Sequence, residues 1–231
     1  MNIGSKLLTM SLLAFAGLVV SQPASASYLI TTSLTDNFPP GDTPLNFNAY
    51  APGLSNAVMT PAGPIVLGGA TISFAPGAYL AQGDVSGVVA APVIGPSQVD
   101  TNVYLAAEPN APVTIQFSTP QSFFGLLWGS IDAYNTLSFY DAHGNLIESL
   151  TGSDITSNPD GFQGYGGSSW VDIFAGSDPF TTVVATSSSP AFEFDYVTAS
   201  AVPEPATLSL FGVGLLGAAA MFRRRKPNKA A

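Results

Sequence analysis

Carboxylates dominate the reactive side chains of this chain, which has no cysteine and one histidine, His143. The lack of cysteine excludes disulfides, thiolate metal sites and thiol nucleophiles. His143 lies in a predicted tight turn, residues 141–145, where we expect neither a triad base nor a zinc ligand. A G-x-G-x-x-G run at residues 212–217 lies inside an apolar span near the C-terminus. A dinucleotide site needs that run after a strand that opens a βαβ unit, so none is predicted.

Three carboxylates raise the question of glycoside hydrolysis, which needs a pair of acidic side chains across the scissile bond. They are Glu148, Glu193 and Asp195. Strict alternation over residues 192–197 places Glu193 and Asp195 on one strand face and three aromatic residues on the other. We predict that the acidic face is solvated. The chain is therefore not predicted to be an enzyme, and a secreted polysaccharide hydrolase stays an alternative.

The residue types are also compatible with two other kinds of binding site. Loop aromatic residues offer flat faces to sugar rings, which makes a carbohydrate-binding module the main alternative function; they are Tyr134, Phe162 and Tyr165. Trp128 lies in an apolar run and is expected in the core. No cofactor is predicted, although aspartates near a hairpin and a Gly-rich loop suit a structural Ca²⁺. Those aspartates are Asp132, Asp141, Asp154, Asp160 and Asp172.

The positions of the charged residues limit the classes of partner that the chain can bind. All six basic residues lie at the two ends, and none stands between Leu7 and Phe222, where all fifteen acidic residues lie. Nucleic-acid binding requires cations against phosphate, so it is excluded for the body. Recognition of phosphorylated or carboxylated small molecules by Arg or Lys is excluded there for the same reason.

The elements that must position these residues are predicted to be strands. Charged residues make up only 9% of the chain, which has 23 Gly and 19 Pro, as expected of a turn-rich all-β protein. We predict an antiparallel β-sandwich, jelly-roll-like, for residues 27–200. A hairpin around the turn at 141–145 is the clearest element, and residues 152–169 form a long Gly-rich connection. Predicted strands cover residues 28–33, 71–74, 85–89, 99–105, 113–117, 123–130, 136–140, 146–150, 170–174, 181–186 and 192–197.

The N-terminal end, residues 1–26, has the pattern of a secretory signal peptide. Lys6 gives a positive start, residues 7–20 are apolar, and Ala24 and Ala26 are small residues suited to cleavage by signal peptidase. An uncleaved N-terminal membrane anchor is the alternative. We expect cleavage before Ser27.

The C-terminal end, residues 201–231, has three parts. Val202, Pro203, Glu204 and Pro205 precede an apolar span, residues 206–222. At about 1.5 Å per residue this span reaches about 25 Å, enough for a short transmembrane helix. A basic tail follows at 223–231, and its cluster acts as a cytoplasmic stop by the positive-inside rule. The cluster is Arg223, Arg224, Arg225 and Lys226.

This order of motif, apolar span and arginines resembles the PEP-CTERM signal of exosortase-sorted bacterial surface proteins. The resemblance implies that an exosortase-type membrane protease recognises Pro203-Glu204-Pro205 and removes the tail. The body resembles a subset of such proteins through residues 124–137 (FGLLWGSIDAYNTL) and 192–195 (FEFD). It implies a structural or adhesive protein of the cell surface or extracellular matrix, with exopolysaccharide as a further partner. We expect export through the inner membrane, a single-pass C-terminal anchor before processing, and then a surface or extracellular location.

Overall fold

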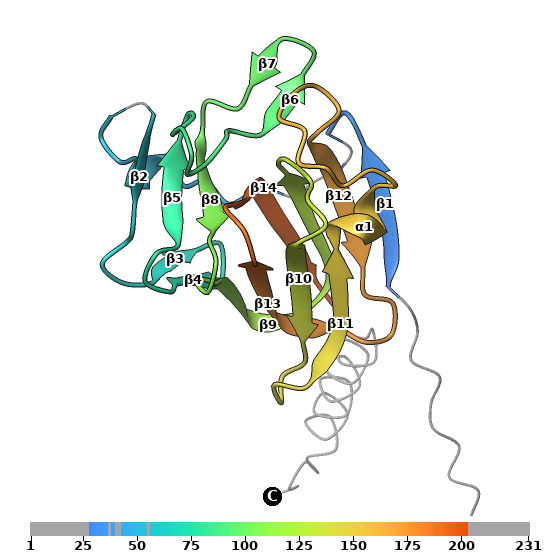
Figure 1. The fold of residues 1–231 in the computed structure, drawn as a ribbon. Coiled ribbons are helices and arrows are strands. Elements are labelled where there is room, and N and C mark those ends of the chain that lie inside the picture. Colours follow the sequence, from blue (N-terminus) through green and yellow to red (C-terminus); the bar gives the residue numbers. More distant parts are fainter. Residues whose placement is uncertain (1–27, 37, 40–42, 55, 203–231) are drawn as a thin grey trace, which may run out of the picture.

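The computed structural model describes residues 28–36, 38–39, 43–54 and 56–202 (Figure 1). The predicted signal peptide, the transmembrane span at 206–222 and the basic tail lie outside the described residues. No helix within the described ranges is both long and apolar enough to cross a membrane.

The described chain is almost entirely β-structure, and every pair of named strands is antiparallel. Helical structure among these residues consists of a 3-10 turn, Asn48–Tyr50, and one short helix, α1 (Gly152–Ile155). The strands are β1 (Leu29–Ser33), β2 (Ala57–Met59), β3 (Ile65–Leu67), β4 (Ala70–Phe74), β5 (Tyr79–Gln82), β6 (Val93–Gly95), β7 (Gln98–Val99), β8 (Val103–Ala107), β9 (Val113–Trp128), β10 (Asn135–Tyr140), β11 (Leu146–Thr151), β12 (Ser169–Phe174), β13 (Phe180–Ser187) and β14 (Phe192–Ala201).

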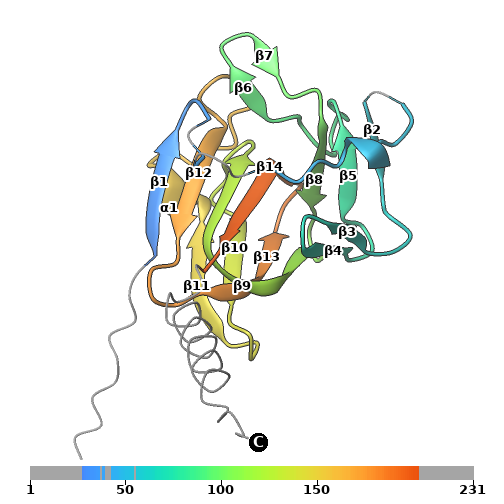
Figure 2. The same cartoon turned by 180° about the vertical axis from the view of Figure 1, so that it is seen from behind.

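The long strand β9 organises the fold. Its first part, residues 113–117, pairs with β13 and β4, whereas its second part, residues 123–128, pairs with β12 and β14. Exposed Pro120 lies between the two parts, and the pairing of β9 with both β13 and β14 shifts register nearby. Figures 1 and 2 show β9 as the long bent strand that runs through both halves of the sheet. Among the described residues one sheet of 12 strands results, beside the small β6–β7 hairpin.

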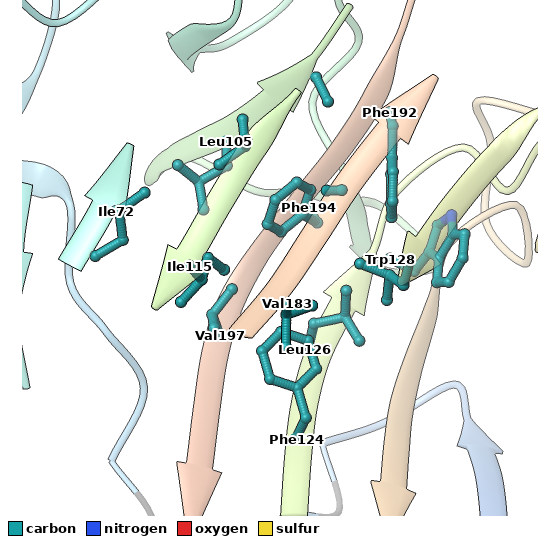
Figure 3. Packing of buried hydrophobic residues seen from close by; sticks show 14 of the residues in the cluster. Ile72, Leu105, Ile115, Phe124, Leu126, Trp128, Val183, Phe192, Phe194 and Val197 are labelled. Atoms are coloured by element: carbon teal, nitrogen blue, oxygen red, sulfur yellow. The ribbon is translucent and has the colours of Figure 1, made fainter. Parts of the chain in front are cut away.

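The core fills the space between the two halves of this curled sheet. Phe124 on the second part of β9 makes edge-on ring contacts with Phe139 of β10 and Phe180 of β13, at 5.8 and 6.1 Å between centroids. Trp128 is fully buried and stacks on Phe192 of β14 at 4.5 Å. Figure 3 shows Phe124, Trp128 and Phe192 in one cluster with aliphatic residues from β4, β8 and β9. Because the described body has no basic residue, burial and backbone hydrogen bonds hold it together.

The structure confirms the all-β, antiparallel prediction and the core position of Trp128. It differs from the predicted pair of separate sheets, because β9 belongs to both halves. The hairpin of β10 and β11 is confirmed, with Leu137 opposite Leu150.

Some predicted strands are wrong in their limits. Residues 85–89 form a tight turn closed by a single bridge between Val85 and Val89. Residues 99–105 are divided between β7 and β8, and residues 113–117 and 123–130 are joined in one strand. Strands β2, β3, β5 and β6 lie outside the predicted ranges; three of them have only three residues, too few for a periodic pattern.

Candidate ligand-binding cavity

A cavity of about 560 Å³ lies where four segments distant in sequence meet. The turn at residues 84–90 follows β5, and residues 130–134 follow β9. Residues 160–163 belong to the Gly-rich connection, and residues 190–193 lead into β14. The cavity is lined by Asp84, Ser86, Gly87, Val88, Val89, Ala90, Ser130, Asp132, Tyr134, Asp160, Gly161, Gln163, Pro190, Ala191 and Glu193.

Glu193 is the most deeply buried acidic side chain of this wall, with 2% of its surface exposed. The backbone N–H of Ala90 donates to its Oε1 and the hydroxyl of Ser130 donates to its Oε2, both at 2.8 Å. Its backbone carbonyl accepts from the N–H of Gly129 at 2.9 Å. Burial raises the pKa of Glu193 to about 7, although the two side-chain hydrogen bonds favour the ionised form. The carboxyl therefore exchanges a proton near neutral pH.

Asp132 and Asp160 are brought together by an antiparallel bridge between the segment after β9 and the Gly-rich connection. Gly161 donates its N–H to the carbonyl of Ile131 at 3.0 Å, which holds the connection against the cavity. Gly161 has φ of +68°, and a Cβ at that position would overlap the Asp132 carboxylate. Only a residue without a side chain fits this close approach.

Asp132 is 7% exposed, and burial raises the pKa of its carboxyl. A hydrogen bond from Tyr134 opposes this effect, while the charge of Asp160 adds to it. Burial and the hydrogen bond with Asp132 raise the pKa of Tyr134 to about 12, so the phenol keeps its proton. The Tyr134 hydroxyl also lies 3.3 Å from the carbonyl of Pro190, to which it can donate.

A second buried acidic pair lies further along β14. Asp195 is 3% exposed and forms a hydrogen bond with Asp100, which is 2% exposed. Burial raises the pKa of Asp195 well above its usual value, and the charge of Asp100 adds to this. Asp100 accepts from the N–H of Asn102 at 3.0 Å, and burial raises its pKa too. The pair lies beside a cavity of about 270 Å³ that Asp195 lines with Asn102 and Tyr196.

The predicted solvated face of β14 is wrong, since both Glu193 and Asp195 are buried. Strand β14 lies between β8 and β9, and the turn at 84–90 covers Glu193 while Asn102 lies against Asp195. The alternation over 192–197 is the pattern of a half-buried strand. No feature of the local sequence indicates that other segments also pack on the acidic face. The Glu148, Glu193 and Asp195 constellation is not assembled, because Glu148 lies on β11 and does not line the cavity.

Of the three predicted glycan-contact residues, one reaches the cavity. Tyr134 lines it, whereas Phe162 and Tyr165 are 58% and 43% exposed and do not. Sequence reasoning missed Ser130, Asp84 and Gln163 as wall residues. Their types are ordinary for turns and loops, so only the meeting of the four segments distinguishes them.

The five aspartates considered for Ca²⁺ are not brought together. Asp132 and Asp160 meet at the cavity, but Asp141 accepts from the N–H groups of His143 and Asn145 within its own turn, both at 2.8 Å. Asp154 accepts from the N–H of Thr151 at 2.7 Å and caps α1, and Asp172 is buried on β12. Among the described residues no group of three or more His, Cys, Asp or Glu is arranged to hold a metal ion.

The sorting residues fall mostly beyond the described part of the chain. Val202 is described and its N–H donates to the carbonyl of Pro120 at 3.1 Å, so β14 continues to the edge of the motif. Outside the described residues lie Ala24, Ala26, Pro203, Glu204, Pro205, Arg223, Arg224, Arg225 and Lys226.

Comparison with known proteins bears on this end of the chain. Neither the curated proteins nor the solved structures contain a match to the sequence or the fold. One family model does match: the PEP-CTERM protein-sorting motif, over residues 201–226. This range holds the Pro203-Glu204-Pro205 motif, the apolar span and the basic cluster, and it confirms the resemblance drawn from them. The chain therefore carries the C-terminal sorting signal of PEP-CTERM proteins, which marks it as an exported protein.

Proposed function

We propose that this chain is a structural or adhesive protein of the cell surface or the extracellular polysaccharide matrix. The match to the PEP-CTERM sorting motif at residues 201–226 carries the proposal. In this scheme signal peptidase cuts after Ala26 and the span at 206–222 tethers the body. An exosortase-type protease then removes the tail.

The physical chemistry of the C-terminal end supports a removable tether. Pro203 and Pro205 fix φ and lack N–H donors, which favours an extended segment over a helix on either side of Glu204. The span is at the short end for crossing a bilayer, at about 17 residues. The four cations at 223–226 stop its transfer. A protease active at the outer face of the inner membrane could therefore reach the motif while the span holds the body in place.

The body supports a role outside the cell. Its stability uses neither disulfides nor ion pairs with Lys or Arg, because residues 28–202 contain none of these residues. A fold held by burial and backbone pairing does not depend on the redox state of its surroundings. An excess of acidic groups also keeps an exported protein soluble.

Mass spectrometry of the protein from the surface fraction of the cells that make it tests the sorting step. We expect an N-terminus at Ser27 and a C-terminus at or near residues 203–205. Glu204→Ala should leave the protein in the membrane fraction with its tail, whereas Lys229→Ala, outside the motif and the cluster, should be processed normally. Surface protein that ends at Ala231 would overturn the sorting proposal.

The structural or adhesive role needs a separate measurement. Cells that lack this chain should release more polysaccharide, or hold less of it, than cells with the gene restored. Equal matrix mass and cohesion in both would overturn the role while leaving sorting intact.

A further inference from the structure

We propose that the cavity walled by Glu193, Asp132, Asp160 and Tyr134 is a binding site for a sugar residue that carries no negative charge, whether neutral or amino-bearing. This inference deepens the proposed function, on which its biological setting rests. The binding itself is a property of the described body and is testable without it.

The size and wall of the cavity suit one or two sugar rings. A volume of about 560 Å³ lies within the range of small-molecule sites, roughly 300–1,000 Å³. The wall combines one carboxylate from each of the four segments with backbone groups of the 86–90 turn and the amide of Gln163. A sugar presents several hydroxyl donors around a ring, and ionised carboxylates accept such hydrogen bonds strongly.

The arrangement of the acidic groups argues against a metal ion as the ligand. Four carboxylates line the cavity, yet in the described part of the chain no three acidic groups converge as a metal centre requires. Calcium needs six to eight oxygen atoms within about 2.6 Å. Acceptors spread around a wall fit a ligand that is itself spread out and carries its own donors.

Charge decides which sugars fit. Residues 28–202 contain no Lys or Arg, so nothing in the wall pairs with a uronate, a sulfate or a phosphate. A negative ligand would face Asp132, Asp160 and exposed Asp84 without compensation. A neutral sugar avoids this repulsion, and an amino sugar gains from it.

The wall is preorganised. The two hydrogen bonds from Ala90 and Ser130 fix the Glu193 carboxyl, and the Asp132–Asp160 bridge fixes the opposite segment. The Tyr134 hydroxyl is held between Asp132 and Pro190. Groups that are already fixed lose little conformational entropy when a ligand binds, which favours affinity.

Glu193 gives the site two hydrogen-bonding states near neutral pH. When protonated it donates one hydrogen bond, and when ionised it only accepts. The titratable groups that line the same cavity are Asp84, Asp132, Asp160 and Tyr134, so no basic group counters its charge. Glu193→Gln keeps a neutral donor at all pH values, and the affinity of that variant should vary less between pH 6 and 8.

The decisive test is isothermal titration of the protein purified from the cells that make it, with its C-terminal end as mass spectrometry finds it. The probes are oligosaccharides released from the same cells' exopolysaccharide, a cellotriose, a glucosamine trimer and a galacturonate trimer. We expect saturable binding of a neutral or amino-bearing probe and none of the galacturonate. Tighter binding of galacturonate, or no binding of any probe at millimolar concentration, would overturn the proposal.

Variants locate the site. Gln163→Ala, Asp132→Asn and Tyr134→Ala should each weaken binding roughly tenfold, the loss of one or two hydrogen bonds to the sugar. Tyr165→Ala and Glu148→Gln, outside the cavity wall, are matched controls and should bind as the wild type does. Because Gln163 is exposed, its removal leaves folding intact, and circular dichroism checks the other two. Equal affinity of all five variants would contradict this site.

The result separates this inference from the proposed function. Absence of sugar binding, with normal processing and a normal matrix, would overturn the proposed sugar site alone. Sugar binding by a protein that keeps its C-terminal tail would overturn the proposed sorting step alone.

Discussion

The hydroxyl of Ser130 donates a 2.8 Å hydrogen bond to Oε2 of Glu193, 63 residues away in the sequence. Ser130 has φ of +26°, in a region that residues other than glycine rarely adopt. The contact joins the end of β9 to the start of β14 inside the cavity. It shows that the acidic wall is built by the packing of segments that are distant in the sequence.

The pH dependence of stability should report on Glu193. Its folded pKa of about 7 lies above the ordinary glutamate value of 4.5, so the folded state binds more protons between these values. Its contribution is complete below pH 4.5 and is lost as pH rises through about 7, with an amplitude of about 3 kcal/mol. Glu193→Gln should remove this part of the decline, measured by urea unfolding from pH 4 to 9. A decline as steep as that of the wild type would contradict the assignment.

The Asp100–Asp195 pair should add to the same decline. Both pKa values are raised by burial, so stability falls as these carboxyls lose their protons at higher pH. Asp195→Asn supplies a permanent donor to Asp100 and removes a buried charge. At pH 8 it should raise the free energy of unfolding by roughly 1–3 kcal/mol, with a smaller effect at pH 4. Destabilisation at pH 8 would show that the ionised pair is preferred.

Gly161 should tolerate no side chain. Gly161→Ala meets both an unfavourable φ of +68° and the Asp132 carboxylate, whereas Gly144→Ala meets only an unfavourable φ of +80° in open space. The control should cost about 1 kcal/mol for backbone strain alone. Gly161→Ala should cost more and should also weaken sugar binding. Equal unfolding free energies for the two variants would mean that the close approach to Asp132 has no cost.

The contact between the two halves of the sheet should depend on Phe124. Its ring is fully buried and contacts Phe139 and Phe180, so Phe124→Ala should cost roughly 3–5 kcal/mol in thermal or urea unfolding. The matched control Phe162→Ala removes a ring that is 58% exposed and should change stability by about 0.5 kcal/mol or less. Similar losses from both variants would be inconsistent with a core centred on Phe124.

Local pattern predicted those elements whose partners are close in sequence. The β10–β11 hairpin is one, because its two strands and its turn lie within residues 135–151 and Asp141 with Gly144 specify the turn. The two parts of β9 were both recognised by composition. Their union in one bent strand was not, since Pro120 signals a break and only pairing with four other strands keeps the chain extended there.

Of the predicted glycan-contact residues only Tyr134 lines the cavity, and the wall residues Asp132, Asp160 and Glu193 were considered from the sequence for other roles. The sequence predicts that Glu193 and Asp195 face solvent. The alternation of apolar and polar residues shows which side chains share one face of a strand, but it does not show what packs on that face. The cover of Glu193 comes from Ala90, 103 residues earlier. Such a contact has no signature in either segment.

The sequence by itself determined the sorting signal, the absence of thiol chemistry and the all-β character of the body. These follow from composition, charge placement and short motifs, which do not depend on distant contacts. Only the tertiary structure decided that two acidic residues of β14 are buried and that Asp132, Asp160, Tyr134 and Glu193 face one cavity. Burial and pKa depend on which segments meet in space, as Ala90 and Ser130 meet at Glu193.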